Sequence, residues 1–327
     1  MSSEPVVAQD INFSQFYELP LLRNPALAGI FNGDIRFEAA YRTQWGSVTV
    51  PYRTEALGGE IRMPFNSSDY VTAGMQVTHD VAGDSKLTKI QLLPVLALNK
   101  CLSPENNTYL SFGVSGGAVQ QSFDPSQLKF DDQFVNGSYN ASNTTQETFS
   151  ATHLIYWDLT AGLSFSAQPE NTGFYVGVAL FHINRARVSF DPLNGQRLNQ
   201  KLVVNGGLIM PSGEHDQMTV YADLFFQGGN RQGQGGFMYK RNIFETDGDE
   251  QKLAISAGTF FRWNDAVIPV IKFDYYKTTL GITYDINISK LRTASQLRGA
   301  GEITLTYRDF LKRYNNEDRK TRCPAKF

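Results

Sequence analysis

The chain has 327 residues, a formal net charge of −2 at pH 7, 19% charged residues and 13% aromatic residues. This balance excludes a nucleic-acid-binding protein that relies on a basic surface, because there is no basic excess to neutralise phosphates. A helical membrane protein is also excluded, because the best apolar run, 92–98, is much shorter than the roughly 18 residues that a membrane helix needs. Many aromatic residues and 28 glycines, combined with few charges, favour an all-β protein.

Residues 1–10 lack the basic and apolar segments of a signal peptide, although Val7, Ala8 and Gln9 resemble the end of one. We expect a residual or disordered N-terminus here, with the export signal missing from the sequence or replaced at its start. Residues 11–31 combine aromatic residues, a turn at Asn24-Pro25 and a run of small residues, without a regular period. They predict a short segment that packs beneath or inside the β-structure that follows.

From residue 35 onwards, apolar and polar residues alternate in stretches of about ten residues. Near the C-terminus, for example, Leu280 and Ile282 alternate with Gly281 and Thr283. A period of two is typical of a strand with one apolar and one polar face, and about nine to eleven residues is the length with which a tilted strand crosses a bilayer. Strands are predicted at about 35–45, 53–63, 69–79, 86–99, 107–120, 154–166, 172–183, 200–211, 217–227, 234–243, 252–263, 266–276, 278–289 and 299–308.

These fourteen predicted strands indicate an all-β fold, an antiparallel transmembrane β-barrel with long extracellular loops. A soluble β-sandwich is the weaker alternative. An even number of strands places both chain ends on the periplasmic side. The barrel then spans 32–308, residues 11–31 are an N-terminal periplasmic or plug segment, and 309–327 are a periplasmic C-terminal tail. Pro94 lacks a donor for the strand ladder, so it predicts a bulge or a strand end within the fourth strand.

The longest polar segment, 122–152, follows the fifth predicted strand and is expected to be an extracellular loop. Four aromatic residues stand in it among Asn and Ser: Phe123, Phe130, Phe134 and Tyr139. Aromatic side chains of this kind anchor protein interfaces, so these four are candidate partner-binding residues. The alternative is that they fold the loop back over its own barrel.

The sequence offers no catalytic, cofactor-binding or metal motif with convincing spacing. Asp131-Asp132 is a weak calcium candidate, because it lacks the spaced Asp, Asn and Gly of a dedicated loop. Charged residues on the polar strand faces either line a pore or pair with each other in a filled barrel. Cys101 and Cys323 can pair only if their Cα atoms lie within about 7 Å, which the sequence leaves open. The four histidines are far apart and are interpreted as girdle or loop residues: His79, His153, His182 and His215.

Several motifs occur in a distinctive order: FSQFY at 13–17, NPALAG at 24–29, AYRTQW at 40–45, GFYVGVALFHIN at 173–184, RWNDAVIPVI at 262–271, GITYDINISKL at 281–291 and a terminal Cys-Pro at 323–324. In these motifs the chain resembles the PorP/SprF family, outer-membrane proteins of the type IX secretion system of Bacteroidota. The residues that carry the resemblance are Phe13, Phe16, Tyr17, Asn24, Pro25, Gly29, Tyr41, Arg42, Trp45, His182, Arg262, Asp265, Pro269, Tyr284, Asp285 and Cys323.

The resemblance implies a non-enzymatic protein of the bacterial outer membrane, without a cofactor, associated with type IX protein secretion and gliding motility. It implies two kinds of partner besides the lipid bilayer. One is a large secreted adhesin with a type IX C-terminal signal, which the protein binds or anchors. The other is a set of periplasmic lipoproteins of the secretion machine. Reasoning from the residues alone leaves a diffusion porin as the alternative, which needs an open and hydrated lumen.

Overall fold

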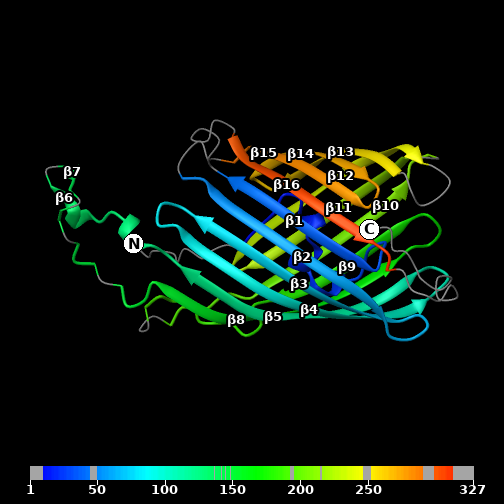
Figure 1. Cartoon of the computed structure of the whole chain (residues 1–327), viewed down its shortest axis with the longest axis horizontal. Coiled ribbons are helices and arrows are strands. Elements are labelled where there is room, and N and C mark those ends of the chain that lie inside the picture. Colours follow the sequence, from blue (N-terminus) through cyan, green and yellow to red (C-terminus); the bar gives the residue numbers. More distant parts are fainter. Residues whose placement is uncertain are drawn as a thin grey trace.

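The computed structural model describes residues 10–44, 50–135, 137–140, 142–143, 145–147, 149–191, 195–213, 216–245, 252–289 and 298–311. Fourteen antiparallel strands form a closed barrel, and the first and last of them pair with each other (Figure 1). The predicted transmembrane β-barrel is therefore confirmed. Its strands are β1 (Ile35–Gln44), β2 (Tyr52–Pro64), β3 (Tyr70–Ala82), β4 (Leu87–Ser103), β5 (Thr108–Ser122), β8 (His153–Ala167), β9 (Gly173–Phe181), β10 (Lys201–Pro211), β11 (Asp216–Gln227), β12 (Asn230–Glu245), β13 (Lys252–Arg262), β14 (Ala266–Tyr275), β15 (Thr278–Asn287) and β16 (Arg298–Asp309).

The two ends of the barrel differ in their connections. We call one the loop end, because it carries the long connections 123–152 and 182–200. The first of these includes a small hairpin, β6 (Phe134–Val135) and β7 (Ser138–Tyr139), which projects beyond the barrel on the left of Figure 1. The opposite end, the turn end, carries short connections such as 65–69 and 276–277 and the last residues of β16.

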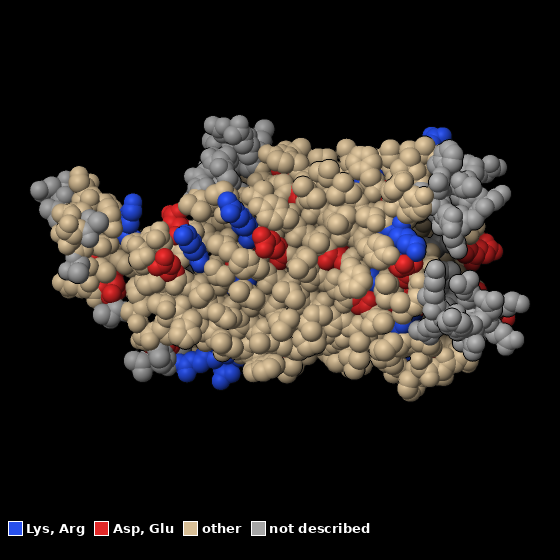
Figure 2. Space-filling model, in the orientation of Figure 1, with Lys and Arg blue, Asp and Glu red and all other residues tan. Residues whose placement is uncertain are grey.

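The outer face of the barrel is apolar, as strict alternation along the strands requires. In β15, Ile282 is 45% exposed, whereas the next residue, Thr283, points into the barrel and is 3% exposed. Figure 2 shows charged residues gathered towards the two ends of the visible face, with a largely uncharged band between them. Exposed aromatic residues lie near both ends, Trp157 and Trp263 at the loop end and Tyr275 and Tyr307 at the turn end. An apolar band between aromatic girdles is the surface that a bilayer covers.

Pro94 neither ends β4 nor starts a bulge. The pairs Leu92↔Ala118 and Val95↔Ser115 on either side of it belong to one register between β4 and β5. The ladder is interrupted locally, because proline has no N–H to donate, while the Ser115 hydroxyl donates to the Pro94 carbonyl over 3.0 Å. The predicted bulge or strand end is therefore wrong, and the strand continues to Ser103.

The interior of the barrel is filled by the residues that precede β1. We call residues 10–34 the plug; it contains two 3-10 helices, η1 (Phe16–Glu18) and η2 (Pro25–Leu27), and the short helix α1 (Pro20–Arg23). Prolines at the first helical positions explain where α1 and η2 start, since the fixed φ of proline suits the beginning of a helix. Two further 3-10 helices lie in the long connection, η3 (Pro125–Gln127) and η4 (Asp131–Gln133). Within the described residues, no helix is long and apolar enough to cross a membrane.

The hydrophobic core lies between the plug and the wall. Phe16 and Tyr17 pack against Phe260, Ile268 and Val270 of β13 and β14. Other buried groups join Phe13 and Leu19 to the first two strands, and Leu21 to β4. The plug thus supplies the apolar side chains that a hollow barrel of this size would lack.

We expect Ile282→Arg to lower the free energy of unfolding by about 2–4 kcal/mol, because it places a charge in the middle of the lipid-facing band. The matched control Ile282→Leu keeps apolar volume and is expected to cost less than about 1.5 kcal/mol. Urea refolding titrations in lipid vesicles measure both. Equal losses for the two variants would show that position 282 does not face lipid.

Candidate functional site

A buried polar cluster near the loop end holds the first part of the plug. The Glu302 carboxylate accepts hydrogen bonds from the backbone N–H groups of Ser14 (2.8 Å) and Gln15 (2.7 Å). Arg42 donates to Glu302 over 3.1 Å and to Asp285 over 2.8 Å. The Ser14 hydroxyl donates to Asp285 over 2.6 Å. Two carboxylates are thus neutralised in a buried site and given defined hydrogen bonds, which is the condition under which buried charges are tolerated.

Arg262 completes this cluster from β13. Its guanidinium donates to Asp285 over 3.0 Å, to Asp265 over 3.0 Å and to the Ser14 hydroxyl over 2.8 Å. Four strands, β1, β13, β15 and β16, therefore meet at one serine of the plug. The cluster makes the position of Ser14 depend on wall residues that are far apart in the sequence.

Two ion pairs hold the middle of the plug. Arg23 pairs with Asp223 of β11 and donates to the Tyr175 hydroxyl over 2.8 Å. Glu18 pairs with Lys272 of β14. These lumen charges pair with each other and with the plug, so within the described residues the interior has the arrangement of a filled barrel, and not that of an open pore.

The last part of the plug is held by its backbone. The Gly29 N–H donates to Glu60 over 2.7 Å, and Arg62 donates to the carbonyls of Gly29 and Phe31. Gly29 has a positive φ of 83° and lies against Thr72, which leaves no space for a Cβ atom. The glycine in the NPALAG motif is thus required both by its backbone conformation and by the nearby wall.

The wall carries glycines where the plug touches it. A Cβ atom at Gly113 would lie 2.3 Å from the Pro25 carbonyl carbon, and one at Gly162 would lie 2.0 Å from the Asn24 side-chain oxygen. Gly281 of β15 leaves room for Gln15 in the same way. The wall is therefore shaped for the plug, which indicates that the plug is a permanent part of the structure.

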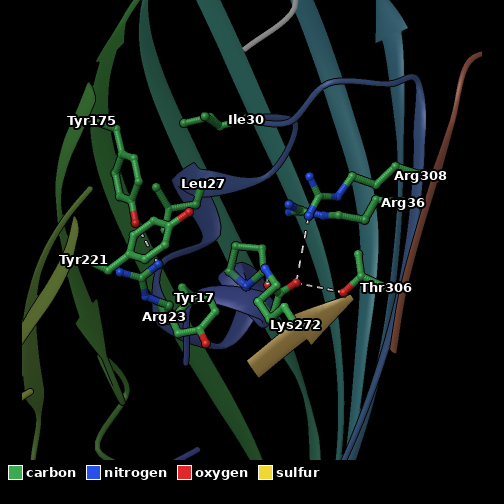
Figure 3. A pocket seen from close by; sticks show the side chains of 12 residues that line it. Tyr17, Arg23, Leu27, Ile30, Arg36, Tyr175, Tyr221, Lys272, Thr306 and Arg308 are labelled. Carbon is green, nitrogen blue, oxygen red and sulfur yellow. Dashed lines mark hydrogen bonds and ion pairs between the residues drawn. The ribbon is translucent and has the colours of Figure 1, made fainter. Parts of the chain in front are cut away.

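A cavity of about 50 Å³ lies between plug and wall towards the turn end. Figure 3 shows Tyr175 and Tyr221 of the wall on one side of it, Arg36 and Arg308 on another, and Tyr17 of the plug nearby. A polar cavity of this volume is large enough for a few water molecules. The cavity does not indicate a pathway for solutes, because the plug residues around it are bonded to the wall.

The loop-end mouth holds the start of the plug through Asp10. His182 donates from Nε2 to Asp10 over 2.9 Å, and its Nδ1 lies 2.9 Å from an oxygen of Asp158 on β8. The ammonium groups of Lys201 and Lys89 lie 3.4 Å and 3.6 Å from the Asp10 carboxylate. We call these five residues the Asp10 clasp. His182 lies in the 182–200 connection, so its interpretation as a girdle or loop residue is confirmed for the loop, but its ring is buried between two carboxylates, which the sequence did not predict.

Charge explains the protonation of the clasp. Burial raises the pKa of Asp10, but Lys201, the hydrogen bond from His182 and Lys89 outweigh it and hold this pKa well below its ordinary value. Burial lowers the pKa of His182, but the hydrogen bonds to Asp10 and Asp158 outweigh it and raise the pKa to about 9. His182 is therefore a cation at neutral pH, and the clasp consists of three cations and two anions.

The four candidate partner-binding residues of the long connection divide into two pairs. Phe123 packs against Phe149 and Phe190, with ring centroids 5.2 Å and 4.9 Å away, and Phe130 lies 5.9 Å from Phe149. These two fold the connection onto itself and onto the neighbouring one. Phe134 and Tyr139 form the β6–β7 pair and remain 46% and 38% exposed. The exposed tip of the connection is therefore the part that remains available to a partner.

The motif residues have different positions. The plug contains Phe13, Phe16, Tyr17, Asn24, Pro25 and Gly29, all of them buried. Three more, Arg42, Arg262 and Asp285, form the polar cluster around Ser14, and Asp265 pairs with Arg262. The outer face carries Tyr41, Pro269 and Tyr284. Trp45, Cys323 and with it the question of a Cys101–Cys323 pair, residues 1–9 and the tail beyond residue 311 lie outside the described residues.

Sequence reasoning missed the residues that bond the motif residues to each other. Two signals were available in the sequence. Ser14 stands inside the FSQFY motif, and three charged residues stand in or beside an apolar segment: Asp10, Glu18 and Arg23. Glu302 was predicted as one of the charges on the polar strand faces, but nothing in the local sequence indicated that it would bond to the plug backbone. No group of His, Cys, Asp and Glu among the described residues is arranged to hold a metal ion.

We expect Gly113→Ala to destabilise the protein by about 1–3 kcal/mol, because the new methyl group meets plug backbone that has no room to move. The control is Gly206→Ala, whose methyl group would point outward and meet only the Tyr175 carbonyl at an ordinary 3.5 Å. Thermal unfolding, followed by the gel shift between folded and unfolded barrel, measures both. If Gly206→Ala destabilised the protein as much as Gly113→Ala, the wall at Gly113 would not be specifically shaped for the plug.

The clasp predicts a loss of stability at alkaline pH. The folded pKa of His182, about 9, lies above its ordinary value of 6.5, so its contribution is complete below pH 6.5 and disappears as the pH rises through 9. The upper limit of the loss is about 3 kcal/mol. Melting temperatures of the wild type and His182→Asn between pH 6 and pH 10 test this. The same pH profile for both proteins would rule out His182 as its source.

Among known proteins, outer-membrane barrels of solved structure resemble this chain only in fold. None of the curated proteins matches the chain. Among solved structures, CdiB from Escherichia coli is 8% identical with a TM-score of 0.46, over 83% of this chain and 63% of that one. The CymD monoaromatic hydrocarbon channel is 10% identical with a TM-score of 0.43, over 90% and 93%. This chain spans 60% of CdiB from Acinetobacter baumannii. Likenesses at this level carry no argument about function.

The family comparison is more informative. Residues 6–307 match the family described as type IX secretion system membrane protein PorP/SprF. The matched range includes the plug and all fourteen barrel strands except the last two residues of β16. The chain therefore belongs to the PorP/SprF family of type IX secretion system membrane proteins.

Proposed function

We propose that this protein is a closed, non-enzymatic barrel of the outer membrane that binds or anchors a large secreted adhesin with a type IX C-terminal signal, and that it serves secretion and gliding motility in this way. The support for the partner class is membership of the PorP/SprF family. The observation that supports binding over transport is the plug, which is bonded to the wall along the lumen.

The orientation follows from the connections. In outer-membrane barrels the long connections face the medium and the short turns face the periplasm. The loop end of this barrel is then extracellular, and the turn end faces the periplasmic lipoproteins of the secretion machine. An adhesin held at the cell surface would meet the loop end, where the β6–β7 hairpin projects (Figure 1).

The hairpin has the chemistry of a docking element. Phe134 and Tyr139 lie together with ring centroids 5.6 Å apart, and the Lys129 ammonium lies 4.9 Å from the Tyr139 ring. Phe123 and Phe130 pack internally and so support the connection that presents this tip. Exposed aromatic residues on a supported scaffold are typical of the centre of a protein interface.

The filled lumen counts against a diffusion porin. A porin needs a hydrated path from one mouth to the other, whereas here wall glycines leave space for plug atoms and wall charges bond to them. An enzyme would need a set of reacting groups around a cleft, and the titratable groups described above serve ion pairs that fix the plug.

We expect replacement of residues 126–146 by a short Gly/Ser turn to abolish capture of the secreted adhesin by the purified barrel, because the exposed aromatic tip is removed. The double variant Phe134→Ala/Tyr139→Ala is expected to weaken capture at least tenfold, which corresponds to about 1.4 kcal/mol. The matched control is Phe65→Ala, which removes an exposed aromatic at the turn end. Pull-down with the adhesin measures binding, and the gel shift verifies the barrel. Undiminished capture by the loop-replaced barrel would show that the adhesin docks elsewhere.

A further inference from the structure

The plug crosses the lumen from one mouth to the other. Its first described residue, Asp10, lies beside Lys89 and Lys201, which stand at the loop-end starts of β4 and β10. At the other mouth, the Asp34 N–H donates to the Asp309 carbonyl over 2.7 Å, at the last residue of β16. The described chain therefore starts at the loop end and finishes at the turn end, whereas the even strand count predicted both ends on one side.

We infer that residues 10–34 cross the membrane once inside the barrel, with Asp10 at the extracellular mouth on the same side as the 123–152 connection, while β16 ends on the periplasmic side. The inference rests on the orientation in the proposed function. It assigns a transmembrane path to the plug in addition to the fourteen strands, and it adds the Asp10 end of the plug to the surface that a secreted partner meets.

The order of the contacts supports a single passage. After Asp10, Asn12 donates to Gln232 at the loop end of β12, over 3.3 Å. Glu18 then pairs with Lys272, which lies towards the turn end of β14. Gly29 follows with its hydrogen bond to Glu60. The first residues of the plug thus contact the loop end, and its later residues contact the middle of the barrel and the turn end, as a single passage requires.

A chain that entered and left by the turn end would need a second segment beside the first. On three strands the wall already meets the plug closely, because plug atoms lie within 2.3 Å of the ideal Cβ positions of Gly113, Gly162 and Gly281. The length is sufficient for one crossing. Twenty-four residue steps of up to about 3.4 Å far exceed a hydrocarbon core of about 30 Å, so the plug crosses in a compact form.

The Asp10 clasp holds the plug at the loop-end mouth of the barrel. One carboxylate meets an imidazolium and two ammonium groups, and they come from three different parts of the rim. His182 is itself held by Asp158, so its ring is oriented before it meets Asp10. Withdrawal of Asp10 into the lumen would leave three cations with a single carboxylate in a buried site, which is unfavourable.

The test is an epitope tag inserted directly ahead of Asp10 in the full-length protein, probed with antibody on intact cells and on cells with a permeabilised outer membrane. Two single cysteines in a Cys101→Ser/Cys323→Ser background report orientation with an impermeant maleimide: Ser126→Cys at the loop end and Glu105→Cys at the turn end, both at exposed positions. The gel shift establishes that each variant is folded.

We expect antibody binding and Ser126→Cys labelling in intact cells, with Glu105→Cys labelled only after permeabilisation. If Ser126→Cys is labelled in intact cells but the tag is reached only after permeabilisation, the inference is overturned and the orientation stands. If Glu105→Cys alone is labelled in intact cells, the barrel has the opposite orientation. The inference and the orientation in the proposed function are then both wrong. Should the tag prevent folding, Asn12→Cys in the same background takes its place, with labelling in intact cells as the expected result and labelling only after permeabilisation as the contrary one.

Discussion

The structure depends on the contact between Glu302 of the last strand and the plug backbone at Ser14 and Gln15. A carboxylate buried in the lumen needs partners, and this one finds two N–H groups of the plug and the guanidinium of Arg42. Arg42 and Arg262 in turn hold Asp285. Removing one member of such a cluster leaves an uncompensated buried charge, at a typical cost of about 3–5 kcal/mol. The plug and the polar face of the barrel are therefore stable only together.

The barrel was predictable from the sequence because the strand period is local. In 278–289 the alternation of Ile282 with Thr283 is visible without any knowledge of neighbours, and both faces are placed correctly. The path of the plug was not predictable, since residues 10–34 have no period and their partners lie up to 289 positions away, as in the bond between Gln15 and Thr304. His182 illustrates the same limit: a lone histidine after a strand gives no sign that Asp10 and Asp158 will enclose it.

A filled barrel changes what its two mouths can do. With the lumen occupied, the surfaces at the loop end and the turn end are the parts that remain for partners, and the plug joins them through one continuous chain. Asp10 is held at one mouth and Asp34 at the other, so a partner that altered the Asp10 clasp would act on residues of three strands, β4, β8 and β10, and of the 182–200 connection. This arrangement suits a protein that connects components on the two sides of a membrane better than one that conducts solutes.

The seam of the barrel and the plug depend on the same residues. The seam of the barrel lies between β1 and β16, where Arg42 pairs in register with Glu302. The same two residues hold Ser14, which lies only 21 positions before the start of β1 at Ile35. The seam thus presents a polar pair whose remaining hydrogen-bonding groups are satisfied by the plug. Without the plug, Glu302 would lose the N–H groups of Ser14 and Gln15, so the closed seam is more stable with the plug in place.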